Sequence, residues 1–403
     1  MRCLSMSARS ASLLALLLAL GSTVPASANV KNSMLLSHSP SGEVANAPAT
    51  HPVMSGDGRV ARYVAYLSAA TNIAGGKAVD NLFMVTRAKP YTTTGSRWNE
   101  GPTRLITKGA NGDSWSPAFD GFDDVHGTTA PKCLAFVSKA TNLGGGSSAA
   151  PDVFIKRLPN GAIKRLGGTS GASEVALDGQ CREIAYVRNG RPYVAEVNGR
   201  GRPRAAGGSG ARSLNLSANG ETLTYERGGH VYVWTLGGRA RDLGAGTQVT
   251  SEEWGRYVSF VRGGKIYKAN LKGAVDAAPM PQQGGGTASG AMPSMSAGGD
   301  WSTYAVGPLV AITGYNKAKG ACTPPSYSAE KLMRPLGVVL GELSDLGVAL
   351  PSLPGLLARS AAIQLPDVLD PRPSAHTNYL VYSCAGGPAW LTWVGDQATG
   401  TTP

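Results

Sequence analysis

A single phrase recurs along this chain: usually a serine, then a Gly-containing turn, then a short apolar run that ends in Tyr or Phe. The clear copies are SGDGRVARYVAY from Ser55, LDGQCREIAY from Leu177, SANGETLTY from Ser217 and SAGGDWSTY from Ser296, and looser copies end at Phe136 and Phe260. A unit that returns in this way is one supersecondary module stacked on its neighbours, so the repeat constrains the fold more than any other feature.

The unit around Ser217 reads as a four-stranded antiparallel meander. SLNLS leads in, Asn219-Gly220 suits a hairpin turn, and the alternating segments ETLTYE and HVYVWTL are separated by RGGH. One such sheet cannot bury both of its faces alone, whereas several sheets packed around an axis can. The closer spacings between the terminal aromatics approach the period of about 40 residues found in propeller blades. We therefore predict an all-β propeller of about six four-stranded blades.

The two earliest copies share a longer phrase. YLSAATNIAGGKAVDNLFMV begins at Tyr66, and FVSKATNLGGGSSAAPDVFI begins at Phe136. Together with the turn Ser55-Gly56-Asp57-Gly58, the Ala-Thr-Asn phrases (70–72 and 140–142) resemble the WD40-like PD40 repeats of TolB-type β-propellers. The resemblance covers about residues 50–306 and extends less clearly to 376–395. It implies a propeller fold and says little about activity. The turns at Leu177 and Ser251 depart from the pattern, the first lacking the serine and the second the glycine.

The N-terminus has the features of a secretory signal peptide. Arg2 and Arg9 precede a short apolar run, and Ala26 and Ala28 form an A-x-A pattern, which predicts cleavage near Ala28. An uncleaved anchor is the alternative, although the apolar run is shorter than the ~20 residues that a span needs. We expect a signal peptide at 1–28, propeller blades at 29–306, an insertion at 307–375, and final strands with a tail at 376–403. The exported protein would be secreted or periplasmic.

Without Cys3, an even number of cysteines remains in the exported chain: Cys133, Cys181, Cys322 and Cys384. Such a count is consistent with disulfide bonds in an oxidising compartment. Cys133 and Cys181 precede equivalent strands of successive repeats, and Cys322 and Cys384 flank the insertion. We favour these two pairs, with four buried free thiols as the alternative.

The predicted insertion is rich in Pro, Leu and Ala. Its residues Leu336, Leu340, Leu343 and Leu350 follow a helical spacing, and prolines at 335 and 351 bound the segment. We expect a helical insertion inside the last blade. It could be a cover over apolar surface, a lid over the channel, or a partner-docking helix through these four leucines. A transmembrane span is disfavoured because Gly, Pro and acidic residues interrupt the segment.

The formal net charge is +12. Such a charge can attract acidic wall polymers, anionic lipid head groups or nucleic acid, although scattered cations also serve solubility. The densest cluster, Arg200, Arg202 and Arg204, has no interleaved aromatic residues, so a specific nucleic-acid platform is not expected.

Motifs that carry known chemistry are sparse. The sequence contains no G-x-S-x-G elbow, no H-E-x-x-H and no paired C-x-x-C. Asp120, Asp123 and Asp124 crowd into one segment, which makes them weak candidates for calcium, but their spacing is not that of an EF-hand. No other cofactor is indicated.

These observations favour an exported, non-enzymatic binding or scaffold protein that uses loops at one end of the propeller. Its expected partner is a protein or an envelope component. The alternative is a secreted carbohydrate-active hydrolase whose carboxylates come from several blades. Carboxylates that converge at the channel mouth would favour this enzyme.

Overall fold

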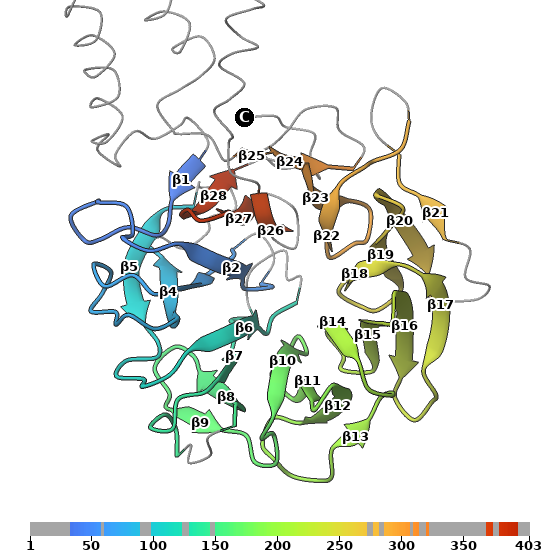
Figure 1. The fold of residues 1–403 in the computed structure, drawn as a ribbon, viewed down its shortest axis with the longest axis horizontal. Coiled ribbons are helices and arrows are strands. Elements are labelled where there is room, and N and C mark those ends of the chain that lie inside the picture. Colours follow the sequence, from blue (N-terminus) through green and yellow to red (C-terminus); the bar gives the residue numbers. More distant parts are fainter. Residues whose placement is uncertain are drawn as a thin grey trace, which may run out of the picture.

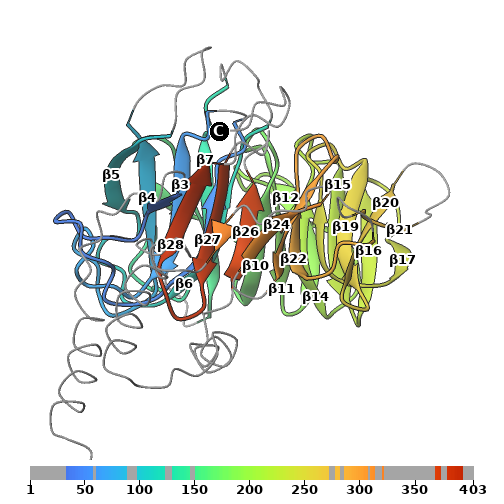
Figure 2. The same ribbon diagram turned by 90° about the horizontal axis from the view of Figure 1, so that it is seen from above.

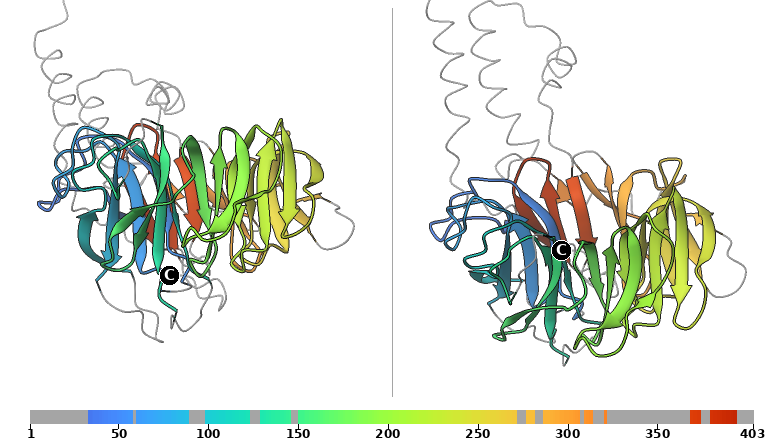
Figure 3. Two further views of the ribbon diagram at one scale, coloured as in Figure 1. Left: turned by 90° about the horizontal axis from the view of Figure 1, so that it is seen from below. Right: turned by 60° about the horizontal axis from the view of Figure 1, so that its bottom comes forward.

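The structure is a computed structural model. It describes residues 33–57, 60–88, 98–122, 129–145, 150–271, 277–281, 286–306, 309–313, 320–321, 368–373 and 379–393. These residues form seven four-stranded antiparallel sheets arranged around a central axis (Figure 1). Seen from the edge, the strands run between the two faces of a thick disc (Figures 2 and 3). The protein is therefore an all-β propeller, as the repeats predict.

Blades 1 to 6 are each built from four consecutive strands. Blade 1 is β2 (Ala49–Met54), β3 (Tyr63–Ser68), β4 (Asn81–Arg87) and β5 (Glu100–Leu105). Blade 2 is β6 (Ser114–Phe119), β7 (Cys133–Ser138), β8 (Asp152–Arg157) and β9 (Ile163–Arg165). Blade 3 is β10 (Ala172–Leu177), β11 (Glu183–Arg188), β12 (Arg191–Glu196) and β13 (Arg204–Ala205).

Blade 4 is β14 (Ala211–Leu216), β15 (Thr222–Arg227), β16 (His230–Thr235) and β17 (Arg241–Ala245). Blade 5 is β18 (Thr247–Ser251), β19 (Tyr257–Arg262), β20 (Lys265–Asn270) and β21 (Ala278–Pro279). Blade 6 is β22 (Ala291–Met295), β23 (Ser302–Val306), β24 (Leu309–Ile312) and β25 (Gly320–Ala321). In every blade the first strand lies nearest the axis (Figure 1).

Blade 7 closes the ring with strands from both ends of the described chain. It contains β26 (Val368–Pro373), β27 (Tyr379–Cys384), β28 (Ala389–Trp393) and, as its outer strand, β1 (Ser33–Leu35), which pairs with β28. The count of about six blades is therefore wrong by one. The strands near the C-terminus make a blade of their own because β1 supplies its missing fourth strand.

The predicted insertion does not lie inside a blade. The segment between Ala321 and Val368 connects blade 6 to blade 7, and strands β24, β25 and β26 lie within the range 307–375. No helix occurs among the described residues, so none of them could cross a membrane as a helix. The expected helix and its residues Leu336, Leu340, Leu343 and Leu350 fall outside the described residues, as does the signal peptide predicted at 1–28.

The aromatic residue that ends each repeat phrase forms the centre of a blade. These residues lie on the second strand and are buried: Tyr66, Phe136, Tyr186, Tyr225, Phe260, Tyr304 and, in blade 7, Tyr382. In blades 1 to 5 each ring stacks on an aromatic residue directly opposite on the third strand, with ring centroids between 5.5 and 6.0 Å apart. Such cross-strand pairs stabilise a sheet beyond the area that they bury.

Small buried residues lie next to these rings. Ala65, Ala135 and Ala185 are fully buried on the second strands of blades 1 to 3. The apolar clusters join residues of successive blades, for example blade 2 with blade 3. The core is consequently a series of blade-to-blade interfaces around the ring, because each sheet hides its faces against its neighbours.

The phrase shared by blades 1 and 2 has a structural role. The amide N–H groups of Asn46 and Thr71 each donate to a side-chain oxygen of the opposite loop, and Asn72 donates to the Val44 carbonyl. Asn111, Thr141 and Asn142 repeat these contacts in blade 2. The Ala-Thr-Asn phrase therefore ties the loop after the second strand to the loop that enters the blade.

Candidate functional site

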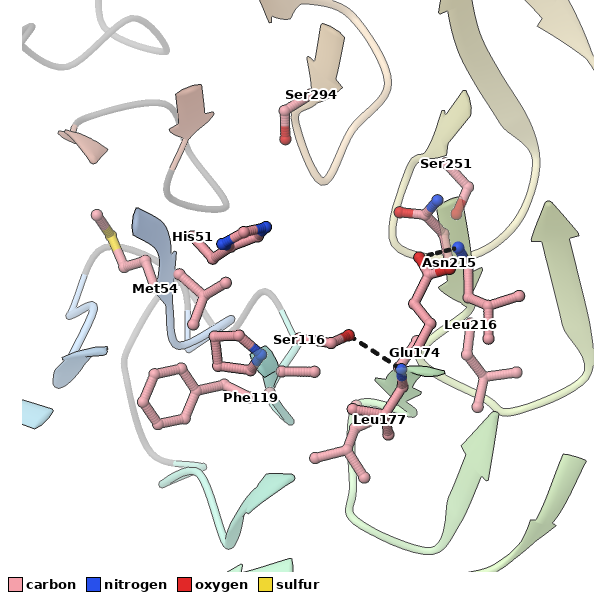
Figure 4. Close-up of a pocket in the computed structure, with 18 of the residues that line it drawn as sticks. His51, Met54, Ser116, Phe119, Glu174, Leu177, Asn215, Leu216, Ser251 and Ser294 are labelled. Atoms are coloured by element: carbon pink, nitrogen blue, oxygen red, sulfur yellow. Dashed lines mark hydrogen bonds between the residues drawn. The ribbon is translucent and has the colours of Figure 1, made fainter. Parts of the chain in front are cut away.

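The candidate site is a cavity of about 500 Å³ in the central channel. Inner strands of blades 1 to 5 line it, and blade 6 adds Ser294. Figure 4 shows side chains from these strands around one space. The labelled polar residues are His51, Ser116, Glu174, Asn215, Ser251 and Ser294 (Figure 4). The arrangement is a mixed polar and apolar cavity, as is common in ligand sites.

A β-bulge interrupts each of the seven inner strands near its start. We call this end of the channel the mouth end. The opposite end, where the first strand of each blade turns into the second, is called the turn end. At the bulges, His51 and Ser116 have positive φ angles of 48° and 51°, a conformation that few non-glycine residues adopt. In blades 1 to 3 the side chain at the bulge, which is His51, Ser116 or Glu174, lines the cavity.

Hydrogen bonds at the mouth connect neighbouring blades. The Val175 N–H donates to Ser116 Oγ (3.0 Å), and the Leu214 N–H donates to Glu174 Oε1 (2.8 Å), as Figure 4 shows. The Met292 N–H likewise donates to Gln248 Oε1 (2.7 Å). Backbone donors at the bulges are satisfied in this way by the preceding blade, which holds the mouth in one shape.

The turn end is narrow because the inner strands meet there through their backbones. The N–H groups of Gly121, Gly179 and Ala218 donate to carbonyls of the next blade, at distances between 2.6 and 3.2 Å. A Cβ on Gly121 would lie 2.8 Å from the backbone nitrogen of Gly56. Glycine is therefore required where blades 1 and 2 approach.

Two aromatic residues also meet at the turn end. Phe122 follows the inner strand of blade 2, and Trp254 follows that of blade 5, with ring centroids 6.2 Å apart. Blades 3 and 4 stand between them along the ring, so this contact spans the channel. The channel cavity is accordingly narrowed at the turn end and presents its variable side chains at the mouth.

Buried carboxylates at the turn end serve the backbone. The N–H groups of Lys132 and Cys133 donate to the Asp120 carboxylate, and those of Gln180 and Arg182 donate to Asp178. Burial raises the pKa of Asp120 to about 6 and raises that of Asp178 as well. Both carboxylates occupy the place that Ser217 holds in blade 4, where its hydroxyl accepts the Thr222 N–H. The turn at Leu177 therefore lacks serine because Asp178 replaces it.

Of the three calcium candidates, the structure describes only Asp120. The Asp120 carboxylate accepts the backbone hydrogen bonds just described, and Asp123 and Asp124 lie outside the described residues. Within the described ranges, no group of three His, Cys, Asp or Glu side chains is placed to hold a metal ion. Calcium binding stays an untested expectation.

The first predicted disulfide is confirmed. Cys133 and Cys181 are bonded, with Cα atoms 5.8 Å apart, and so join blade 2 to blade 3. The Arg157 guanidinium contacts both sulfur atoms, at 3.2 and 3.0 Å. Cys384 is also disulfide-bonded. Its partner lies outside the described residues, where Cys322 falls, so the second pair stays a prediction.

Sequence reasoning missed the residues of the mouth. His51, Ser116 and Glu174 belong to no motif, yet the bulge positions carried a signal. Four of the seven inner strands have a proline directly after the bulge position: Pro52, Pro117, Pro293 and Pro371. Each inner strand is an edge strand of its sheet, and proline inside a sheet is confined to edges and bulges. A proline in the strand that leads into the repeat phrase therefore marks this position.

Comparisons with known proteins identify no family for this chain. No family model matches the chain, and no curated protein sequence matches it. Among solved structures, a chain of a nidogen/laminin complex is similar, with 14% identity and a TM-score of 0.38 over 58% of this chain and 85% of that chain. This similarity is too weak to carry an argument.

Proposed function

We propose that this protein is an exported, non-enzymatic binding or scaffold protein that receives part of a protein or envelope component at the mouth of its channel. The channel cavity carries this proposal. Blades 1 to 6 contribute side chains to one space, and the backbone that positions them is similar from blade to blade. A rigid scaffold with variable side chains at its mouth suits recognition.

The position of the carboxylates supports binding over glycoside hydrolysis. Three carboxylates line the cavity: Glu174, Glu252 and Glu253. Glu252 is buried and accepts the N–H groups of Trp254 and Arg256, which leaves Glu174 and Glu253 as the pair to compare. Glu174 lies at the bulge at the mouth end of β10, and Gln248 is the equivalent residue of β18. Glu253 follows Gln248 by five residues, so it lies five residues farther along the channel than Glu174 does. At about 3.3 Å per residue, the two are separated by roughly 15 Å along the channel. Glycosidase pairs stand about 5 to 10 Å apart.

The assignment to the TolB type and the export of the protein are parts of the same proposal. The Ser55 hydroxyl donates to Asp57 (2.6 Å) and accepts the Tyr63 N–H, which gives the Ser-x-Asp-Gly turn a clear physical purpose. The Cys133–Cys181 disulfide supports an oxidising compartment. The A-x-A pattern at Ala26 and Ala28 supports entry by a cleaved signal peptide.

The test is to fill the cavity. Ser251 is half-buried and lines it, so Ser251→Trp would occupy space that a ligand needs. Thr235→Trp, on the exposed end of β16, is the matched control. Wild-type and variant proteins are immobilised and exposed to a solubilised envelope fraction, and bound material is identified by mass spectrometry.

We expect a component that binds wild type and Thr235→Trp but is lost with Ser251→Trp. Capture by all three proteins alike would show that the cavity is not the site. Hydrolysis of any glycan in a broad panel, lost on changing Glu174 to Gln, would replace binding with catalysis as the function.

A further inference from the structure

A second surface lies beside the mouth on blades 3 to 5. The turns between the second and third strands of these blades read RNGR, RGGH and RGGK. With Arg212, they place a row of cations at the mouth end, because these turns adjoin the starts of the inner strands. We call this row the basic rim; its members are Arg188, Arg191, Arg212, Arg227, Arg262 and Lys265.

Three arginines of the rim repeat one geometry from blade to blade. Arg188 lies over the Tyr193 ring (4.7 Å), Arg227 over Tyr232 (4.3 Å) and Arg262 over Tyr267 (5.0 Å), measured from the guanidinium carbon to the ring centroid. Stacking fixes each guanidinium plane before any partner arrives, so less side-chain entropy is lost on binding.

Backbone contacts add to this order. The Arg262 Nε–H donates to the Ala245 carbonyl (2.7 Å), and Arg188 donates to the Gly168 carbonyl. Each guanidinium has five N–H donors, so these bonds use only part of its capacity. The rim therefore presents oriented donors at successive blades.

Few acidic groups face the rim. The loops that enter blades 3, 4 and 5, at 166–171, 206–211 and 244–247, contain no Asp or Glu. Glu226 is buried and pairs with Arg212, Asp242 pairs with His230, and Glu174 accepts the Leu214 N–H at the mouth. The six cations of the rim outnumber these three carboxylates, which leaves the rim with a net positive charge.

The chemistry of the rim selects among classes of partner. Of the exposed large apolar side chains in the described residues, Val44, Leu236, Trp254 and Val306, none belongs to it. A folded protein partner would lack the buried apolar anchor on which such interfaces depend. Nucleic-acid bases would find the tyrosine faces covered by arginine.

We propose that the basic rim binds a linear polyanion whose phosphate or carboxylate groups recur along its chain. Sheets packed face to face stand about 10 Å apart, so equivalent arginines repeat at an interval that a flexible polymer with regular anionic groups can follow. Arginine recognises phosphate and carboxylate with the same donors, so the rim alone does not choose between them.

The test uses inorganic polyphosphate and polygalacturonate as probes, with binding measured by calorimetry at about 50 mM and about 200 mM salt. The rim variant combines Arg191→Glu with Lys265→Glu, both exposed, and leaves the arginine–tyrosine stacks intact. The matched control combines Arg200→Glu with Arg239→Glu, exposed in the loops after β12 and β16 at the turn end, with the same change in net charge.

We expect the rim variant to bind at least one polymer about tenfold more weakly at low salt, and to lower the slope of log K against log salt by about 2. The control should bind within about twofold of wild type, and unfolding midpoints should verify that both variants are folded. The polymer that binds more tightly identifies phosphate or carboxylate as the natural group.

Three outcomes would overturn the proposal: no binding of either polymer by wild type, equal losses in both variants, or tighter binding of a single-stranded oligonucleotide of matched charge. None of these bears on the channel cavity, because Ser251 is not part of the rim.

Discussion

At the scale of single residues, one position shows how different side chains meet the same backbone requirement. The turn after each inner strand leaves backbone N–H groups that need acceptors. Ser55 and Ser217 satisfy them with a hydroxyl, Asp120 and Asp178 with a short carboxylate, and Glu252 with a longer one. The repeat is degenerate in sequence here because an oxygen acceptor is required and its chemical type is not.

The Asp120 carboxylate should make stability fall as pH rises. Burial raises its pKa to about 6 from an unfolded value of 3.8, so the folded protein binds a proton that the unfolded chain releases between these values. The stability from that proton is complete below about pH 4 and lost by about pH 7. Two pKa units correspond to about 3 kcal/mol.

Asp120→Asn keeps an oxygen for the Lys132 and Cys133 N–H groups and cannot ionise. Relative to this variant, wild type should lose up to about 3 kcal/mol of unfolding free energy between about pH 4 and pH 7. Urea unfolding at several pH values measures the difference. The exposed substitution Glu221→Gln is the control, and parallel curves for wild type and Asp120→Asn would show that burial does not tune this carboxyl.

At the scale of elements, the local sequence determines each hairpin. The interfaces between blades form only when the ring closes. The aromatic pairs, such as Tyr66 with Phe83, follow from local strand register. The Cys133–Cys181 bond instead joins two blades across a sequence separation of 48 residues. It should stabilise the interface between blades 2 and 3 chiefly by restricting the unfolded chain.

Replacing both cysteines with alanine should lower the free energy of unfolding by about 4 kcal/mol, the loop-closure value for a loop of this length. Denaturant unfolding of the double variant and of wild type, both without reductant, measures this difference in unfolding free energy and leaves the disulfide of Cys384 intact. A loss below about 1 kcal/mol would mean that the packing of the two blades already imposes the constraint.

How far sequence predicts these elements depends on how local they are. Tyr186, Tyr225 and Phe260 were located because alternation and turn residues are written into short segments. Glu174 and Ser116 were missed because they become neighbours only when blades 2 and 3 pack. The sequence shows the turn at Leu177 only as one that lacks serine, since the shared role of Ser217 and Asp178 is visible only in their hydrogen bonds.

At the scale of the whole molecule, the ring is closed by three residues. Strand β1 pairs Ser33, Met34 and Leu35 with β28 and joins the beginning of the described chain to its end. Leu36, fully buried, adds to the core between blades 7 and 1. Without β1, blade 7 would expose the hydrogen-bonding edge of β28, and exposed edges promote association.

A chain that starts at Ser37 should therefore unfold at a lower temperature and associate as its concentration rises. A chain that starts at Asn29 keeps β1 and serves as the control. Calorimetry and sedimentation velocity measure the two effects. Equal stability and a monomeric state in both chains would show that the ring holds together without this strand.

The sequence by itself determined the strands, their aromatic centres and the repeated meander, because alternation, turn chemistry and stacking act over distances of a few residues. Only the tertiary structure decided that there are seven blades, that the channel narrows at Gly121, and which residues lie next to Glu174 at the mouth. These depend on ring closure, which brings together residues that are far apart in the chain, and no local pattern records how many modules fit around one axis.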